Sequence, residues 1–277
     1  MRRDGSTPGD PAVEHASGQT GIVGDRLIAG WPAALSVAGS DSWGGAGIQA
    51  DLRTFAAFGV WGAAAVTAVT AQNHKGVLAS SVMTPELVRD QIDASADALQ
   101  ISAIKTGMLG DAAVIEAVAS AYVEHNFGPL VVDPVQAASH GGSLLDPKGL
   151  PSLVSHLLPL AALVTPNLPE AESLVGGTIS SREGMVDAAR EIGLLGPAAV
   201  LIKGGHLEGA ESPDLLWANG RAVWLEGRRL PTRHTHGTGC TLSAGIAACL
   251  AAGDEMHSAC VRAKTYVTRC LGALASG

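Results

Sequence analysis

The sequence predicts an α/β fold, in which a central and mostly parallel sheet is flanked by helices on both faces. Short apolar runs alternate with longer amphipathic segments from residue 33 onward, which is the order of parallel strands joined by crossover helices. Polar or glycine-rich residues follow each apolar run, as expected where parallel strands end at one edge of a sheet. The dipeptide Asn219-Gly220 lies between two short apolar segments and predicts an additional antiparallel hairpin.

Six apolar runs have the length and composition of short buried strands. They span residues 33–38, 64–71, 101–105, 130–132, 161–165 and 200–203. The hairpin adds one strand on each side of its turn, over residues 215–217 and 223–225.

Amphipathic segments between these runs predict the helices. The first five helices are expected at residues 46–58, 85–99, 111–125, 167–175 and 183–195. Two more helices, at 238–252 and 255–274, complete the predicted order.

The 277 residues predict a short leader followed by one domain. An α/β fold of this size often stays in one piece, and a hydrophobic fraction of 47 % supplies a sizeable core. Residues 1–30 are rich in Gly, Asp, Ser and Pro and contain no apolar segment, so we expect a disordered N-terminal extension rather than a secretory signal. Residues 31–277 are expected to form a single domain without repeats or linkers.

The charge and the cysteines exclude several classes of function. The formal net charge is −8 and no basic cluster is present, which argues against nucleic acid and anionic membranes as partners. No apolar run is long enough to span a membrane. Cys240, Cys249, Cys260 and Cys270 lack the spacing of a zinc site, and three of them have the helical, Ala-rich surroundings that are typical of reduced thiols in a cytoplasmic protein.

The residues that follow the six runs predict a ligand site at the carboxyl edge of the sheet. These residues are Gly39-Ser40-Asp41, Gln72-Asn73, Lys105-Thr106-Gly107-Met108, Asp133-Pro134, Pro166-Asn167 and Lys203-Gly204-Gly205-His206.

The segment Gly237-Thr238-Gly239-Cys240 opens an apolar helix and predicts an anion site. Glycines allow backbone amides to turn toward a ligand, and the N-terminus of a helix favours negative charge. Such a site suits a phosphoryl group in transfer, although a glycine-rich helix start can also be purely structural. Cys240 falls in the first turn, where we expect a lowered thiol pKa and a sulfur that faces the pocket; a buried packing role is the alternative.

Asn167 and Glu170 have two interpretations. Their spacing of three residues at a helix start is that of a capping box. In the functional interpretation, Glu170 and Asn167 organise Mg²⁺ or its water ligands together with Asp133, because Mg²⁺ takes few protein ligands. Lys203, at the end of a buried run, would then balance phosphate charge.

The remaining motifs are weaker. Gly44-Gly45-Ala46-Gly47 matches neither a Walker A loop nor a dinucleotide loop, and indicates only a close approach of the backbone to a small substrate. His206, His234 and His236 lack the spacing of a zinc site, so hydrogen bonding is the expected role of these histidines.

Taken together, these motifs form an ordered series that resembles a known family. The blocks are Ala38-Gly39-Ser40-Asp41 through Asp51, Thr67 through Asn73, Lys105-Thr106-Gly107-Met108-Leu109, Val132-Asp133-Pro134-Val135, Thr165 through Ala171, Lys203-Gly204-Gly205-His206 and His236 through Ser243. The series is similar to the hydroxymethylpyrimidine/phosphomethylpyrimidine kinases, a branch of the ribokinase-like superfamily, over about residues 33–275.

The resemblance implies a ribokinase-like fold, a homodimer, and two successive phosphoryl transfers from ATP with Mg²⁺. Gln72 would hydrogen-bond the pyrimidine, while Gly39, Met108 and Val135 would close around the ring and Asp51 would border it. Gly237 and Gly239 would stabilise the transferring group, and Cys240 would take the place of the catalytic aspartate of related sugar kinases. The nucleotide and its metal ion would be bound by Asp133, Asn167, Glu170, Lys203 and Thr238.

The sequence departs from the family pattern at Trp43, Gln136 and His140, which affects the expected selectivity and lid more than the kinase chemistry. Pyridoxal kinase activity on the same scaffold is an alternative, because pyridoxal is also a flat heteroaromatic ring with a hydroxymethyl arm. A ligand-binding relative without catalysis is a second alternative. Retention of Asp133, Glu170, Lys203 and Cys240 argues against it, because binding alone does not need all four.

Overall fold

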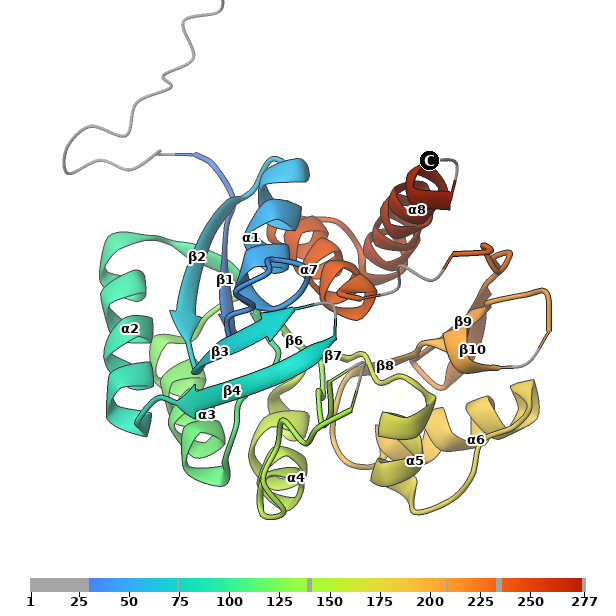
Figure 1. Ribbon diagram of the computed structural model, residues 1–277, viewed down its shortest axis with the longest axis horizontal. Helices are drawn as coiled ribbons and strands as arrows, with labels where there is room; N and C mark the ends of the chain where they lie inside the picture. Colours follow the sequence, from blue (N-terminus) through green and yellow to red (C-terminus); the bar gives the residue numbers. More distant parts are fainter. Residues whose placement is uncertain (1–29, 74, 139–140, 208, 233–235, 276–277) are drawn as a thin grey trace, which may run out of the picture. The chain divides into compact units, whose positions relative to one another are not determined.

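The central sheet has eight strands in the computed structural model, which describes residues 30–275 except 74, 139–140, 208 and 233–235. The strand order is β10-β9-β8-β7-β6-β5-β1-β2 (Figure 1). The strands are β1 (Ala33–Ala38), β2 (Trp61–Val66), β5 (Ile101–Thr106), β6 (Leu130–Val132), β7 (Leu163–Val164), β8 (Ala199–Ile202), β9 (Asp214–Ala218) and β10 (Arg221–Leu225).

The strand pairing confirms the predicted direction of the sheet. β1 is parallel to both β2 and β5, and the parallel pairing continues through β6, β7 and β8. Among these strands only β9 is reversed, because it pairs antiparallel with both β8 and β10. The turn between them has positive φ at both Asn219 (52°) and Gly220 (71°), the conformation that favours Asn-Gly in tight hairpins.

Helices cover both faces of the sheet and create two apolar cores. One core contains buried side chains of α2, α3, α5 and α6, and the other contains those of α1, α7 and α8. The strands alternate between the cores: Val132 belongs to the first and Val131 to the second. The bounds are α1 (Gly47–Ala57), α2 (Pro85–Ala98), α3 (Ala112–His125), α4 (Gly149–Ser152), α5 (Leu168–Val175), α6 (Arg182–Gly193), α7 (Thr238–Ala251) and α8 (Met256–Ala275). A π-helical turn (Leu153–Leu157) and 3₁₀ turns (Leu158–Leu160, Gly204–His206) complete the list.

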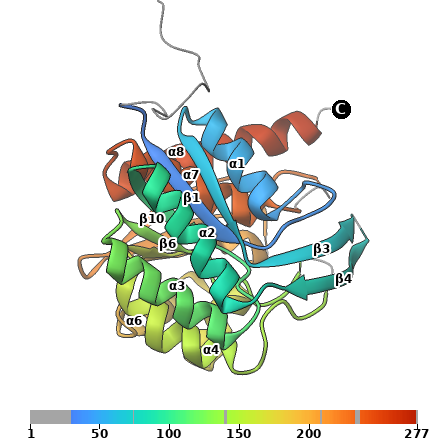
Figure 2. The ribbon, with the colours of Figure 1, turned by 90° about the vertical axis from the view of Figure 1, so that its left-hand side faces the viewer.

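A second, two-stranded sheet corrects the strand predicted at residues 64–71. The chain leaves the central sheet after β2, and β3 (Ala68–Asn73) instead pairs antiparallel with β4 (Gly76–Val82). This pair projects away from the central sheet (Figure 2). Thr67 separates the two strands: its amide donates to the Ala38 carbonyl, its carbonyl accepts from the Met83 amide, and its hydroxyl donates to the Met108 carbonyl. These partners are distant in sequence, so the apolar run alone gave no sign of the break.

The helix predictions are confirmed to within a few residues at each end, which is the usual uncertainty of helix boundaries. Within the described residues, no helix is both long and apolar enough to cross a membrane. The predicted N-terminal extension lies outside the described residues, except for Gly30, and stays a prediction.

Candidate active site

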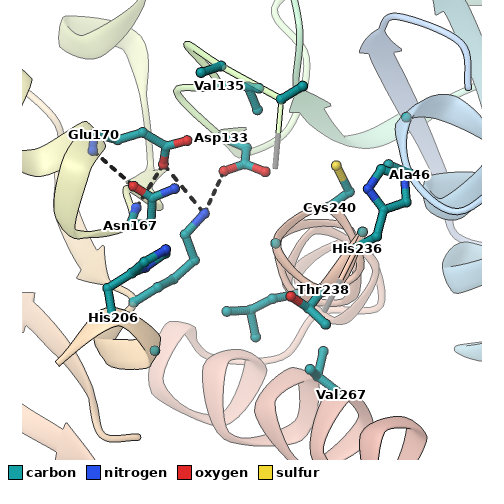
Figure 3. Close-up of a pocket in the computed structure, with 18 of the residues that line it drawn as sticks. Ala46, Asp133, Val135, Asn167, Glu170, His206, His236, Thr238, Cys240 and Val267 are labelled. Carbon is teal, nitrogen blue, oxygen red and sulfur yellow. Dashed lines mark hydrogen bonds and ion pairs between the residues drawn. The ribbon is translucent and has the colours of Figure 1, made fainter. Parts of the chain in front are cut away.

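The principal cavity opens at the carboxyl ends of the parallel strands, at the edge that the sequence predicted. Its volume is about 800 Å³. Residues that follow β1, β5, β6 and β8 contribute to its wall, together with the first turn of α7, the two-stranded sheet and the last turns of α8. Figure 3 shows Asp133, Glu170 and Asn167 on one side and Cys240, Thr238 and His236 on the other.

The Gly237–Cys240 segment forms the predicted loop at the start of α7. Gly237 is the N-cap, with φ of 79°, and a Cβ atom there would lie 1.8 Å from the Gly45 carbonyl oxygen. Gly239 faces the charged residues, because a Cβ at this position would lie 3.4 Å from Lys203 Nζ. The helix start thus packs on the 44–47 loop, and its residues from Gly237 to Cys240 line the cavity, where the N-terminus of a helix favours negative charge.

The substitution Gly237→Ala is expected to displace this loop. A positive φ costs alanine about 1–3 kcal/mol, and the close Gly45 carbonyl adds a clash. We expect a lower melting temperature and at least a tenfold loss of turnover, about 1.4 kcal/mol in the barrier. Gly253→Ala is the matched control, because Gly253 also has positive φ (91°) but has open space around it. Equal loss of turnover in both variants would show that the Gly237–Cys240 loop has no specific role in the reaction.

A row of charged side chains crosses the floor of the cavity. Lys203 Nζ lies 2.9 Å from Asp133 Oδ1 and 3.7 Å from Glu170 Oε2. Ser243 donates to Asp133 Oδ2 at 3.1 Å, and Thr165 donates to Oδ1 at 3.3 Å. The structure therefore brings together Asp133, Lys203 and Glu170, which the sequence proposed as partners.

Burial and neighbouring charges shift the two acids in opposite directions. Burial acts to raise the pKa of Asp133, but Lys203 and Lys105 outweigh it and hold this pKa below its ordinary value. Burial raises the pKa of Glu170, against the opposing effect of Lys203 and with a further contribution from Asp133. The environment thus favours the ionised form of Asp133 and disfavours the ionised form of Glu170.

The capping interpretation of Asn167 and Glu170 is confirmed. Asn167 Oδ1 accepts the Glu170 amide at 2.9 Å, and Glu170 Oε2 accepts the Asn167 amide at 2.7 Å. Both residues also line the cavity. The two interpretations therefore apply to the same side chain, because the capping box fixes Glu170 in the cavity wall.

The acids fit a water-mediated magnesium site better than a protein cage. Within the described part of the chain, no three His, Cys, Asp or Glu side chains come together. Lys203 lies between Asp133 and Glu170, so these two carboxylates cannot clamp a metal ion directly. Mg²⁺ retains several waters and is often held by one or two carboxylates together with substrate phosphates. The residues are compatible with that mode.

The predicted low pKa of Cys240 is wrong. Burial raises the pKa of this thiol to about 11, while Lys105 opposes the shift and Asp51 and Asp133 add to it. The amide of Gly47 donates toward the sulfur and also opposes it. Desolvation therefore outweighs the favourable helix N-terminus. The second part of the prediction is met, since Cys240 is part of the cavity wall.

Asp51 is placed beneath the cavity rather than in its wall. Both Asp51 and Lys105 have no exposed side-chain surface, and Lys105 Nζ lies 2.8 Å from Asp51 Oδ2. Ser36 Oγ donates to the same oxygen at 2.6 Å. Lys105 borders the cavity, so Asp51 acts on it only through this lysine. The sequence analysis placed Lys105 at this edge of the sheet but did not predict its pairing with Asp51.

The ring end of the cavity contains four of the predicted substrate residues: Gly39, Gln72, Met108 and Val135. Gly39 allows Met108 to approach, because a Cβ there would lie 2.9 Å from Met108 Sδ. Gln72 reaches the cavity from β3, not from the central sheet.

Asp41 and His236 connect the loops around this end, which the sequence analysis did not predict. His236 Nε2 lies 3.0 Å from Asp41 Oδ2 and 3.3 Å from Gln72 Nε2. Asp41 also accepts the amides of Trp43 and Ala46. The Asp41 carboxylate therefore connects the 43–46 loop to His236, which directly precedes the Gly237–Cys240 segment (the anion loop).

The opposite end of the cavity is lined by Thr238 and by less polar residues from α8. Leu230, Val267 and Leu271 supply apolar surface there. Lys264 and Asp214 form a second buried pair, with Lys264 Nζ 2.9 Å from Asp214 Oδ2, and Asp214 Oδ1 accepts the Gly204 amide. No short motif marks these residues, so sequence reasoning missed this end.

The residues that depart from the family pattern lie around the same cavity. Trp43 is 53 % exposed, and its ring centroid is 5.7 Å from that of His236. Gln136 lines the cavity. His140 and His234 lie outside the described residues.

Comparisons with known proteins agree with this geometry. Residues 41–276 match the family model described as phosphomethylpyrimidine kinase. The hydroxymethylpyrimidine/phosphomethylpyrimidine kinase of Rhizobium meliloti is 48% identical over 242 residues, which cover 87% of this chain and 90% of that protein. A thiamine biosynthesis bifunctional protein of Geobacter sulfurreducens is 46% identical over 84% of this chain, which spans only 48% of its length.

Two solved structures share the fold. The crystal structure of phosphomethylpyrimidine kinase from Clostridium difficile has a TM-score of 0.77 and 39% identity, and the match covers 86% of this chain and 99% of that one. The ADP complex of Bacillus subtilis pyridoxal kinase has a TM-score of 0.80 and 37% identity, with 86% and 90% covered. The ribokinase-like fold expected from the sequence is thereby confirmed.

Proposed function

The chain belongs to the phosphomethylpyrimidine kinase family, and from that premise we propose that it phosphorylates a hydroxymethylpyrimidine and then its monophosphate with ATP, in thiamine biosynthesis. The observation that carries the proposal is the row Asp133–Lys203–Glu170, which faces the anion loop at the start of α7 across one cavity. This arrangement can neutralise a triphosphate on one side and support the transferring group on the other.

The first transfer begins with the pyrimidine at the end lined by Gly39, Gln72, Met108 and Val135. The hydroxyl oxygen forms a bond to the γ-phosphorus of ATP, and the bond from that phosphorus to the β,γ-bridging oxygen breaks, so ADP leaves. The Cys240 thiolate accepts the hydroxyl proton. The amides of Gly237–Cys240 stabilise charge on the phosphoryl oxygens, and Lys203 stabilises the leaving side.

The second transfer does not need the thiolate. Its nucleophile is a phosphate oxygen of the monophosphate, which is already ionised near neutral pH. Positioning and charge stabilisation by the same amides and by Lys203 then suffice. Cys240 is therefore assigned to the first step alone.

Asp133 and Glu170 are the residues that would hold Mg²⁺, through its water ligands and together with the ATP phosphates. When bound, the ion neutralises charge that develops on the phosphate oxygens. Asn167 supports this arrangement by fixing Glu170 in the capping box. The apolar end near Thr238 and Val267 suits the nucleotide base.

Family membership also supports a homodimer and a cytoplasmic location. A net charge of −8 and the lack of a basic cluster fit a small-molecule enzyme that binds neither nucleic acid nor membranes.

Pyridoxal kinase activity is the second candidate, because a pyridoxal kinase shares the fold at a TM-score of 0.80. Turnover of ATP with the hydroxymethylpyrimidine, its monophosphate and pyridoxal separates the candidates. We expect kcat/KM for both pyrimidines to exceed that for pyridoxal by at least about 10²-fold. The reason is that a ring without the groups that hydrogen-bond to Gln72 would leave this side chain unpaired in the cavity. Equal or higher kcat/KM for pyridoxal would overturn the assignment.

A further inference from the structure

The buried ion pair of Asp214 and Lys264 has no role in the proposed transfers, although both residues line the cavity. Asp214 is the first residue of β9, and Lys264 lies in α8. Lys264 Nζ lies 2.9 Å from Asp214 Oδ2 and also donates to the Ser212 carbonyl at 2.9 Å. The other carboxylate oxygen, Oδ1, accepts the amide of Gly204 at 3.0 Å. One carboxylate thus connects α8 to the residue that directly follows Lys203.

The hydrogen bond to this amide lies where the ladder between β8 and β9 ends. The backbone pairing of the two strands extends to Ile202 and Leu215. Beyond that pair the chain turns toward its other neighbour, because the Lys203 amide donates to the Pro166 carbonyl at 2.8 Å. The next amide, that of Gly204, is bound by the side chain at the start of β9 instead of by a backbone carbonyl of that strand.

The turn that follows Lys203 is shaped for this contact. Gly204 begins a 3₁₀ turn, and a Cβ atom there would lie 1.7 Å from the Pro213 carbonyl oxygen. A larger residue would therefore push the turn away from the start of β9. Arg229 Nη1 donates to the Gly205 carbonyl at 2.7 Å, so the next residue of the turn is held as well.

Stability alone does not explain a buried ion pair at this position. The side chains of Asp214 and Lys264 are only 9 % and 15 % exposed, and apolar residues of similar size are often at least as stable as such a pair. Apolar residues, however, could not accept the Gly204 amide. The lysine fixes the orientation of the carboxylate, and the carboxylate fixes the turn.

The placement of Lys203 depends on the same turn. Its Nζ lies 2.9 Å from Asp133 Oδ1 and 3.7 Å from Glu170 Oε2, in the row of charges that faces the anion loop. A displacement of about 1 Å in a reacting group can cost about 10²-fold in rate. The backbone of this lysine is held on one side by Pro166 and on the other, through the next residue, by Asp214.

We propose that Asp214 is a positioning residue for Lys203. Its carboxylate, oriented by Lys264, holds the Gly204 amide and so fixes the point from which the Lys203 side chain enters the cavity. The proposal rests on the role given to Lys203 in the proposed function, but not on the identity of the ring that is phosphorylated.

The test is a double-mutant cycle between Asp214→Ala and Lys203→Met. Two quantities are measured: turnover with the hydroxymethylpyrimidine, and the Kd of Mg-ATP by calorimetry without an acceptor. Asp214→Ala alone should lower turnover at least about tenfold and raise the Kd at least about threefold. In the Lys203→Met background it should change either quantity less than about twofold, because no ammonium remains to be positioned. The melting temperature should fall in both backgrounds, since the Gly204 amide loses its acceptor in both.

Asp214→Asn keeps the test decisive if Asp214→Ala does not fold. Gly204 and Lys264 contact different oxygens of the carboxylate, so the single oxygen of asparagine serves one of them and its NH₂ group faces the other. We expect at least about threefold lower turnover, and again no further loss in the Lys203→Met background.

Ser181→Ala is the matched control. Ser181 caps α6, which packs on β8 and β9, by accepting the Gly184 amide at 3.1 Å, and it lies outside the described wall of the cavity. Its loss should lower the melting temperature but leave turnover and the Kd of Mg-ATP unchanged in both backgrounds.

Equal losses from the Asp214 substitution with and without Lys203 would overturn the proposal, because a general loss of structure acts in both backgrounds alike. Turnover and a Kd equal to those of the parent in a folded Asp214→Ala variant would overturn it too. The Kd is measured without a pyrimidine. Coupling in the Kd of an enzyme that does not phosphorylate the hydroxymethylpyrimidine would therefore support the role of Asp214 and reject the proposed substrate.

Discussion

The variant Cys240→Ala is expected to phosphorylate the hydroxymethylpyrimidine about 10²- to 10⁴-fold more slowly than the wild type, the usual contribution of a proton acceptor. The same variant should lose less than about tenfold on the monophosphate, because a phosphate oxygen has no proton to give up at neutral pH. Binding of the pyrimidine should persist, since Gln72 and the loop amides are unchanged. Steady-state kinetics with the two acceptors measure the difference within one variant.

The pH dependence provides a second signature of Cys240. Because the thiol pKa is about 11, the thiolate fraction rises close to tenfold per pH unit below that value. The wild type should therefore show kcat/KM for the alcohol that increases between pH 7 and 9, whereas Cys240→Ala should lose this increase. Cys249→Ala, a buried site further along α7, is the control. A Cys240→Ala enzyme with wild-type turnover would leave the sulfur with a packing role only.

The variant Glu170→Gln is expected to lose at least about 10²-fold in turnover, as found when a group that stabilises transition-state charge is removed. Its dependence on Mg²⁺ should move to higher concentration. The helix start should survive, because a glutamine oxygen can still accept the Asn167 amide, and loss of a cap costs at most about 2 kcal/mol.

Stability should respond in the opposite direction from activity. The pKa of Glu170 is raised on folding, so its ionised form lowers the free energy of unfolding at pH values above that pKa, and stability increases as the group is protonated. A neutral glutamine removes this penalty, so we expect a melting temperature at pH 7.5 that is equal to or above that of the wild type.

Glu172→Gln is the matched control for Glu170. Glu172 lies on the same helix and also accepts a backbone amide, from Ile179, but it does not line the cavity. Its turnover should match the wild type. Normal turnover of Glu170→Gln at low Mg²⁺ would restrict Glu170 to its capping role.

The sequence predicted the parallel sheet because its signals are local. Each buried strand is a short run such as Leu130–Val132, and hydrophobicity alone identifies it. The Asn219-Gly220 turn is equally local, since its positive φ angles require such residues. In contrast, β4 (Gly76–Val82) mixes Val and Leu with Gly, Ala and Ser without a regular alternation, so neither its pairing with β3 nor the break at Thr67 could be predicted.

The sequence predicted which residues form the site better than it predicted their pKa values. Asp133, Lys203 and Glu170 follow strands or begin a helix, so topology alone brings them together. The pKa of Cys240 depends on how much water reaches the sulfur, and burial is a property of the assembled structure. Lys105 was read as the end of a strand, because its partner Asp51 is 54 residues away in sequence.

The attachment of the two-stranded sheet has a consequence for how new specificities arise. β3 and β4 lie outside the eight-stranded sheet, and they join the rest of the chain through bonds such as the Ser40 amide to the Ala68 carbonyl and the Gln72 amide to the Ser42 hydroxyl. Exposed Val69 and Leu78 show that much of this pair contributes little to either core. Substitutions there can change what Gln72 presents to a ring without lowering the stability of the body. Directed evolution toward other heteroaromatic alcohols should therefore accumulate changes on β3 and β4 first.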